Sequence, residues 1–560
     1  MEFIIRRWKN FCHVSYKGET KKVLPDRVKA LDEGFVESNA GDNTKREEQY
    51  LHGKKLFFCL ISLYFSLFLV GLDQTIVVTV IEVVSTKFDD GFNKKGWLAS
   101  GFLLAMAVCT ASWGRFSIIF GRKICLCSAI IIFEVGSLIS GLANSMDLLI
   151  AGRIICGLGG GGIQTLVYIV IAEIVPINKR TLFMALVGCT FAVSTALGPI
   201  IGGAFTSYVT WRWCFYINLP VGGSALVLLF FSFNPPRPRM TLKEKLLKID
   251  YIGVFLLTTG LVLFLVALSL GASGERQWRS GALISMLTVG GLLFIIFWIW
   301  SLWFSKEPMF NPKVITSAQV SACAASIFGM MFCFIALQLY LVVYFQSVRN
   351  DTSFKSGLEL LPGIILTTLS SIIVGLLIQK TRLIKPFMIL GGILCPVGPG
   401  VVCLLNLSSP SPKRIGLTIL YGIPCGILLQ AGMISLQISA PKIDGGTIMA
   451  TSYVNFARAL GGSLAGVLGD VVFSSSFLSA LKKALSHENK KTILTELESL
   501  DLQNLIQSSA GMSELSLESQ NFIKTQMMKA IRCVFYVCIG SSGVALIACL
   551  FTTNKKLPKK

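Results

Sequence analysis

Four ionisable side chains lie inside long apolar stretches of the sequence: Asp73, Glu134, Arg153 and Arg458. An ionised group near the centre of a bilayer costs about 2.5–3.5 kcal/mol on insertion scales, so each of them needs an opposite charge or a chemical task. The three histidines lie instead in polar segments, at His13, His52 and His487. A side chain that exchanges protons within the apolar stretches must therefore be a carboxyl group.

Asp73, Glu134 and Arg153 combine two carboxyl groups with one guanidinium, and all three fall in the same half of their apolar stretches. Two carboxylates against one guanidinium leave a negative charge that lipid disfavours, so we expect Arg153 to neutralise one carboxylate and the other to bind a proton. We expect Asp73 to carry the proton. The alternative is that Asp73 and Arg153 form a structural pair that fixes helix register, and Glu134 has a structural alternative too.

Other polar side chains in apolar stretches could contact a small organic molecule. We expect four amides and one guanidinium to bind substrate: Gln164, Gln338, Gln430, Asn455 and Arg458. Nearby aromatic rings would offer stacking surfaces, namely Tyr340, Tyr344, Tyr453 and Phe456. Few charges beside many apolar faces suit amphipathic or apolar molecules better than sugars. Hydrogen bonding between helices is the alternative for each amide, and contact with helix carbonyls is the alternative for Arg458.

The elements that carry these residues are typical of membrane-spanning helices. Of 560 residues, 53% are hydrophobic and only 14% are charged, whereas about a quarter of a soluble domain is charged. Stretches that can cross about 30 Å of hydrocarbon predict about fourteen helices and an all-α integral membrane fold. The expected spans are Leu56–Ile81, Trp97–Trp113, Ile124–Ala143, Leu148–Ala172, Leu182–Phe205, Trp213–Phe233, Tyr251–Gly271, Gly281–Phe304, Val320–Phe345, Leu358–Ile378, Phe387–Leu405, Ile415–Leu436, Thr447–Phe473 and Ala530–Phe551.

Basic residues are concentrated in alternate loops between these spans: 115–123, 179–180, 237–248 and 380–385. The excess of Lys and Arg marks cytoplasmic loops, and an even number of spans then places both termini in the cytoplasm. The net charge of +21 therefore reflects topology, and we expect no nucleic-acid partner. Two sequons, at Asn350 and Asn406, fall in loops of the opposite side, where we expect glycosylation.

Several motifs resemble those of one transporter family. The stretch Gly114-Arg-Phe-Ser-Ile-Ile-Phe-Gly-Arg-Lys123 resembles the loop signature of the major facilitator superfamily, although Ile118 replaces its usual acidic residue. Residues 72–75, 153–157 and 198–203 resemble motifs of the fourteen-span drug:proton antiporter branch. Residues 211–220 and 455–462 are similar to segments of fungal mycotoxin and multidrug efflux pumps.

This resemblance implies two six-helix bundles, residues 56–233 and 318–553, with two additional central helices and their loops in residues 234–317. The polar ends of the chain, residues 1–55 and 554–560, are expected to be cytoplasmic tails, and residues 474–529 an outer loop with a surface helix around Ile493, Leu497 and Leu500. The signature residues are expected to have conformational or packing roles: Gly114, Arg122, Lys123, Gly198, Pro199, Gly202 and Gly203.

The resemblance also implies a function, which is the export of small amphipathic compounds (a toxin, secondary metabolite or drug) across the cell membrane in exchange for protons. The alternatives are an importer or vacuolar carrier of siderophores or amino acids, and a membrane-embedded enzyme. An enzyme would need a convergent catalytic set, and the sequence shows none. We expect no metal and no cofactor, and a monomer whose partners are the substrate, protons and the lipid bilayer.

Overall fold

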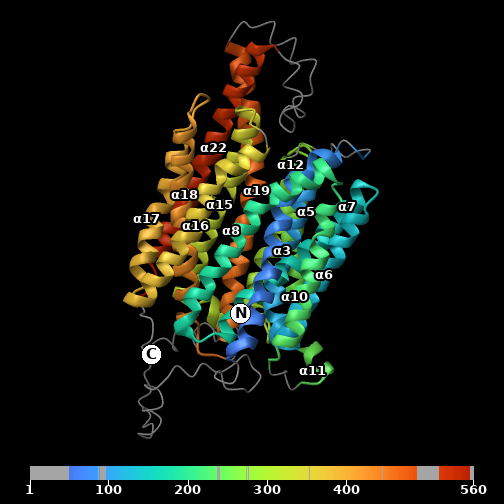
Figure 1. The fold of residues 1–560 in the computed structure, drawn as a ribbon, viewed down its shortest axis with the longest axis vertical. Coiled ribbons are helices and arrows are strands. Elements are labelled where there is room, and N and C mark those ends of the chain that lie inside the picture. Colours follow the sequence, from blue (N-terminus) through green and yellow to red (C-terminus); the bar gives the residue numbers. More distant parts are fainter. Residues whose placement is uncertain are drawn as a thin grey trace, which may run out of the picture.

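The computed structural model describes residues 50–85, 87–88, 96–235, 240–272, 274, 276–351, 353–443, 445–487 and 516–554. All regular structure in these residues is helical, and 14 helices are long and apolar enough to cross a membrane. The expected fold class, an all-α membrane protein with fourteen spans, is therefore confirmed. The helices run roughly parallel to the long axis of the molecule (Figure 1).

The first six spans form one group of helices. They are α3 (Gly53–Ser85), α5 (Gly96–Phe120), α6 (Arg122–Leu142), α7 (Met146–Ile174), α8 (Ile177–Tyr208), and a last span in two pieces, α9 (Trp213–Tyr216) and α10 (Asn218–Ser232). The most buried of them, α7, packs on α5 and α6. It can approach α5 closely because Gly157 has no Cβ atom; a Cβ atom there would overlap the Phe102 carbonyl.

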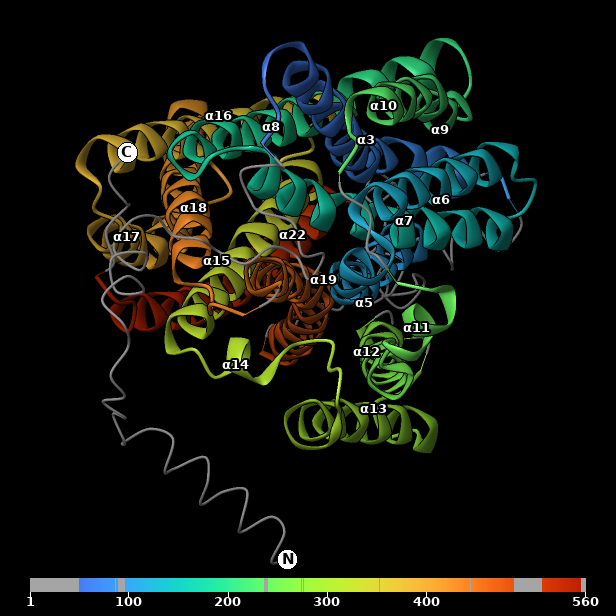
Figure 2. The ribbon, with the colours of Figure 1, turned by 90° about the horizontal axis from the view of Figure 1, so that it is seen from below.

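The next elements connect the two groups. They are α11 (Leu242–Leu247), α12 (Tyr251–Ala272), α13 (Gly281–Ile299), the π-helical turn η2 (Trp300–Phe304) and α14 (Pro312–Ile315). Two of these are spans: α12 packs on α13, α5 and α19, while α13 lies at the periphery (Figure 2). Leu292 and Ile295 of α13 are exposed, as expected for side chains that face lipid.

The last six spans form the second group. They are α15 (Ala318–Val343), which continues into the π-helical turn η3 (Tyr344–Val348), α16 (Ser353–Thr381), α17 (Lys385–Val402), α18 (Ser411–Ser439), α19 (Gly446–His487) and α22 (Leu517–Leu550). The two groups meet chiefly where α5 packs on α19 and α8 packs on α16. Figure 2 shows α5 beside α19 near the centre of the molecule and α8 beside α16 along its upper edge.

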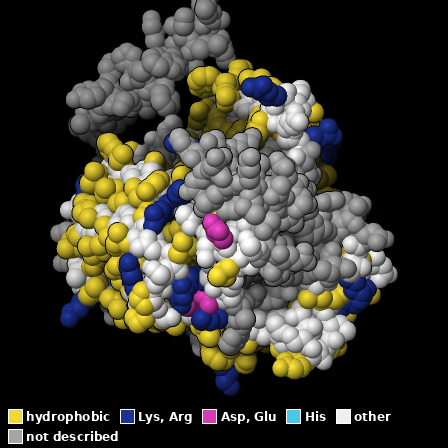
Figure 3. Space-filling view, turned by 90° about the horizontal axis from the view of Figure 1, so that it is seen from above, with side chains coloured by type: hydrophobic (Ala, Val, Ile, Leu, Met, Phe, Trp, Pro, Cys, Tyr) yellow, Lys and Arg dark blue, Asp and Glu magenta, His cyan; other side chains and the backbone are white. Residues whose placement is uncertain are grey.

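The two ends of the described chain lie at the same end of the molecule, because 14 spans separate them. The Leu51 amide donates to the Ile174 carbonyl at 3.2 Å, and the Thr553 amide donates to the Gln319 side chain. We call this the terminal end and the other the distal end. Seen from the distal end, the described surface shows apolar side chains along the flanks and scattered Lys and Arg side chains (Figure 3).

Several helices extend beyond the spans that the apolar pattern predicted, most of all α19 and α22. Helix α5 ends at Phe120, α19 continues to His487 and α22 begins at Leu517. The last turns of α19 and the first turns of α22 therefore stand above the other helices in Figure 1. Hydropathy measures the length of helix that lies in lipid, whereas these helices continue into polar residues. Residues 488–515, which include the expected surface helix, and both polar tails apart from residues 50–55 and Asn554 lie outside the described residues.

Candidate functional site

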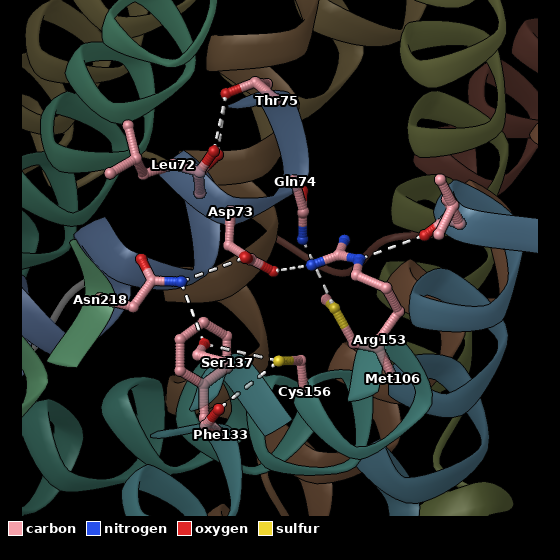
Figure 4. Close-up of polar contacts among 12 residues, drawn as sticks. Leu72, Asp73, Gln74, Thr75, Met106, Phe133, Ser137, Arg153, Cys156 and Asn218 are labelled. Carbon is pink, nitrogen blue, oxygen red and sulfur yellow. Dashed lines mark hydrogen bonds and ion pairs between the residues drawn. The ribbon is translucent and has the colours of Figure 1, made fainter. Parts of the chain in front are cut away.

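A buried ion pair joins Asp73 of α3 to Arg153 of α7 (Figure 4). The exposed fraction of Asp73 is 0% and that of Arg153 is 1%, so both side chains are shielded from bulk solvent. The Arg153 Nε also donates to the Leu98 carbonyl at 3.2 Å, and its guanidinium lies 4.5 Å from the centre of the Phe102 ring. Because a lone buried charge is costly, each member of this pair stabilises the other.

Asn218, the first residue of α10, extends this pair into a polar network. Its Nδ2 donates to Asp73 Oδ1 at 3.2 Å and to Ser137 Oγ at 3.0 Å. Ser137 in turn lies 3.5 Å from the sulfur of Cys156. The pattern of charges did not indicate Asn218, because it stands at the start of an apolar run, where an amide is unremarkable in sequence.

Glu134 of α6 lies beside this network, within electrostatic range of Asp73. Both carboxyl oxygens are buried, and neither has a hydrogen-bond partner in the described part of the chain. The carboxyl group packs against Gly222 of α10, where a Cβ atom would overlap Glu134 Oε1. Ser137 follows Glu134 by three residues and Gly222 follows Asn218 by four, so helix geometry places Glu134 next to the network.

A cavity of about 230 Å³ lies between the two groups of helices. Helices α3, α5, α7 and α8 line it on one side, and α15, η3, α16 and α19 on the other. Most of the lining is apolar, and its larger polar side chains are four amides and two guanidinium groups: Gln74, Gln164, Gln338, Gln346, Arg153 and Arg458. No Asp or Glu of the described chain is among the lining residues.

The structure brings three of the five expected substrate residues to this cavity, namely Gln164, Gln338 and Arg458. Gln430 does not line it. Its Nε2 donates to the Thr181 carbonyl at 2.8 Å and its Oε1 accepts from Ser371 at 3.3 Å, so it joins α18 to α8 and α16. Asn455 is also absent from the lining; it is buried, and its amide has no partner in the residues that the structure describes.

The expected aromatic stacking surfaces are not at the cavity. Tyr453 and Phe456 pack on Phe310, with ring centres 5.3 Å and 5.5 Å away. The hydroxyl groups of Tyr340 and Tyr344 bond elsewhere, to Asp470 and to the Asn406 carbonyl. The expectation was wrong because helical spacing alone does not say which neighbour a ring faces. The rings that do line the cavity are Phe102 and Phe191.

Close contacts join the two groups at the terminal end of the cavity. A Cβ atom at Gly114 of α5 would overlap the hydroxyl of Ser452 of α19. Gln430 and Thr181 form the hydrogen bond described above, and Arg458 donates to the Tyr168 hydroxyl at 2.7 Å. Toward the distal end the cavity reaches Thr79, Gln346 and Ser356, near the distal ends of their helices.

The loop signature is ordered by ion pairs and carbonyl contacts. The connection between α5 and α6 is a single residue, Gly121, whose φ of +97° favours glycine. Arg122 forms a bidentate ion pair with Glu173, with N–O distances of 2.9–3.0 Å. Lys123 donates at 2.5 Å to the Phe230 carbonyl and the Asn234 side chain. The sequence did not indicate Glu173 as a partner, because it is distant along the chain.

The glycines of α8 differ in their surroundings. A Cβ atom at Gly198 or Gly202 would overlap a threonine hydroxyl of α3, whereas one at Gly203 would meet nothing within 4 Å. Pro199, inside the helix, lines the cavity. Two of the three expected glycines therefore face a close helix contact.

The asparagines of both sequons lie at the distal end. Asn350 and Asn406 are both exposed, and the loops that carry them are joined by a hydrogen bond of 2.6 Å from Arg349 to the Leu407 carbonyl. Nowhere in the described ranges do three His, Cys, Asp or Glu side chains gather in an arrangement that could hold a metal ion.

Comparisons with known proteins place this geometry in context. The model of the Major Facilitator Superfamily matches residues 63–466. The chain is 33% identical to Vacuolar basic amino acid transporter 5 of Saccharomyces cerevisiae, over 94% of this chain and 96% of that protein. It is 32% identical to Probable efflux pump gsfJ of Penicillium aethiopicum, over 95% of this chain and 93% of that protein. An inward-facing bacterial homologue of the human lysosomal transporter Spinster shares the fold, with a TM-score of 0.54 and 13% identity. The match covers 91% of this chain and 100% of that structure.

Proposed function

The chain belongs to the major facilitator superfamily and is a membrane transporter, and we propose that it exports small amphipathic organic compounds in exchange for protons. The observation that carries this proposal is the cavity between the two groups of helices, which is mainly apolar and has a few polar groups on its wall. Such a lining suits a molecule that hides an apolar body and presents one or two polar groups. The efflux pump that shares 32% identity supports the direction.

Access to the cavity would alternate between the two ends. The cavity extends toward the distal end, while contacts of α19 with α5 and of α18 with α8 close the terminal end. Opening the terminal end requires these contacts to separate, and the two groups of helices would rock about the cavity. Substrate would then enter from the terminal end and leave at the distal end.

Proton exchange would use the carboxyl groups of Asp73 and Glu134, which lie behind the cavity wall, where Arg153, the partner of Asp73, is a lining residue. Asp73 is held by Arg153 and Asn218, whereas the carboxyl oxygens of Glu134 are buried with no hydrogen-bond partner in the described chain. A buried carboxyl without a counter-charge favours its neutral form. We therefore propose Glu134, in place of Asp73, as the group that carries the proton, with Arg153 holding the charge of Asp73.

The membrane and orientation form part of the same proposal. The described residues of the basic loops lie at the terminal end, which would face the cytoplasm, and Asn350 and Asn406 lie at the distal end. We propose the cell membrane, with Asn350 and Asn406 outside and open to glycosylation. A vacuolar membrane is the alternative, because the 33% identical relative is named for the vacuole.

Transport in sealed vesicles tests the function. The purified protein, reconstituted with a pH-sensitive dye inside the vesicles, is given an imposed pH gradient and a panel of amphipathic compounds, with lysine and arginine as competing candidates. We expect an amphipathic compound to accumulate on the acidic side while protons move the other way. Accumulation without proton movement would refute antiport, and accumulation of lysine or arginine alone would favour the carrier named by the relative.

A further inference from the structure

The charges on the cavity wall do not cancel. Arg153 is neutralised by Asp73, but Arg458 has a different environment. Its contacts in the described structure are with Tyr168, whose hydroxyl accepts at 2.7 Å and whose ring centre lies 5.2 Å from the guanidinium. A phenol and its ring are neutral, so the cavity keeps one positive charge that no acidic lining residue of the described chain balances.

This charge is placed where an anion would stabilise it. The exposed fraction of Arg458 is 6%, and the residue lies well inside α19. A guanidinium shielded from water within a membrane protein is normally paired, because its desolvation is costly. The space in front of it is the cavity itself, so the missing counter-charge has room to arrive with a ligand.

We propose, resting on the function proposed above, that the cavity selects amphipathic organic anions, with a carboxylate or similar anionic group on Arg458. The amide of Gln164 lines the same cavity and is available to orient the anionic group. The apolar body of the ligand then packs on Phe102, Phe191, Ile335 and Leu360. Lysine and arginine fit poorly, because each carries two cationic groups and no Asp or Glu of the described chain lines the cavity to balance the second.

A matched set of ligands tests the selectivity directly. Binding of 4-(1-pyrenyl)butyrate, its primary amide and the corresponding butylammonium is measured by fluorescence at pH 7 on the full-length protein in nanodiscs, without any gradient. We expect the carboxylate to bind at least about tenfold more tightly than the ammonium, because a close ion pair in a partly buried site is worth more than that factor. The neutral amide should fall between them.

Substitutions assign the selectivity to one side chain. Arg458→Gln should reduce the ratio between carboxylate and ammonium to near unity, and Arg458→Lys should restore part of it. Arg279→Gln is the control, because Arg279 is an exposed residue in the connection between α12 and α13 and should leave the ratio unchanged.

Each result decides the proposal. Equal binding of carboxylate and ammonium by the wild type would overturn it, even if Arg458→Gln does not fold, and so would a preference that survives in a folded Arg458→Gln. The measurement uses no transport, so anion preference without proton-driven export would sink only the proposed function. Export without anion preference would sink only this inference.

Discussion

At the scale of single residues, the two carboxyl groups of the first group of helices have different surroundings. Asp73 is enclosed by Arg153 and by the amide of Asn218, while Glu134 packs against Gly222. From the sequence we expected Arg153 to neutralise one of two carboxyl groups and Asp73 to carry the proton, whereas the structure pairs Arg153 with Asp73. That choice depends on which faces of α3, α6 and α7 meet, and periodicity alone does not fix it.

Replacement of Glu134 by glutamine should uncouple transport from protons. Glutamine keeps the shape and the neutral state of a protonated carboxyl group but cannot release a proton. We expect Glu134→Gln to keep substrate exchange between equal concentrations and to lose accumulation driven by a pH gradient. Both are measured in the same vesicles, and gradient-driven accumulation at the wild-type rate would show that Glu134 does not carry the proton.

Replacement of Gly222 by alanine should displace the Glu134 carboxyl group, because the added Cβ atom takes the position of Oε1. Overpacking of this kind costs about 1–3 kcal/mol. We expect Gly222→Ala to lower the thermal unfolding midpoint and to shift the pH dependence of transport. Gly223→Ala is the control, because a Cβ atom there meets nothing within 4 Å. Identical behaviour of the two variants would contradict the packing of Glu134 on α10.

At the scale of elements, close helix contacts depend on glycines at particular positions of α8. The faces of α3 and α8 approach until Gly198 lies on Thr75 and Gly202 lies on Thr79. The motif in the sequence indicated a glycine-rich face, and it predicted which helix would carry it. It did not separate the glycines that face α3 from Gly203, because that distinction depends on the neighbour.

Gly198→Ala and Gly203→Ala form a matched pair that tests this contact. The first places a methyl group on the Thr75 hydroxyl, and the second meets open space. We expect Gly198→Ala to destabilise the protein by about 1–3 kcal/mol and to slow transport, and Gly203→Ala to resemble the wild type. Thermal unfolding in detergent and vesicle transport measure both effects. A larger loss in Gly203→Ala would mean that α8 packs differently.

At the scale of the whole molecule, the sequence predicted the spans, but not how side chains meet between helices. Apolar length and loop charge give the number and order of helices because lipid imposes both. The hydrogen bond of Asn218 to Asp73, and the packing of Tyr453 on Phe310 instead of at the cavity, depend on contacts between helices that are distant in the chain. Such contacts leave no local pattern, so they required the structure.

A disulfide across the terminal end should stop transport if the two groups of helices separate there. A Cβ atom at Gly375 of α16 would lie 3.0 Å from Cγ2 of Thr181 of α8, which is close enough for a cysteine pair after small adjustment. We expect Thr181→Cys/Gly375→Cys to transport when reduced, to stop when oxidised and to recover with reductant. The pair Gly101→Cys/Ile154→Cys, which joins α5 and α7 within one group at a similar separation of 3.3 Å, should transport in both states. Full transport by the oxidised Thr181→Cys/Gly375→Cys protein, with the cross-link confirmed by mass spectrometry, would show that α8 and α16 stay together throughout the cycle, and the terminal end would then have to open elsewhere.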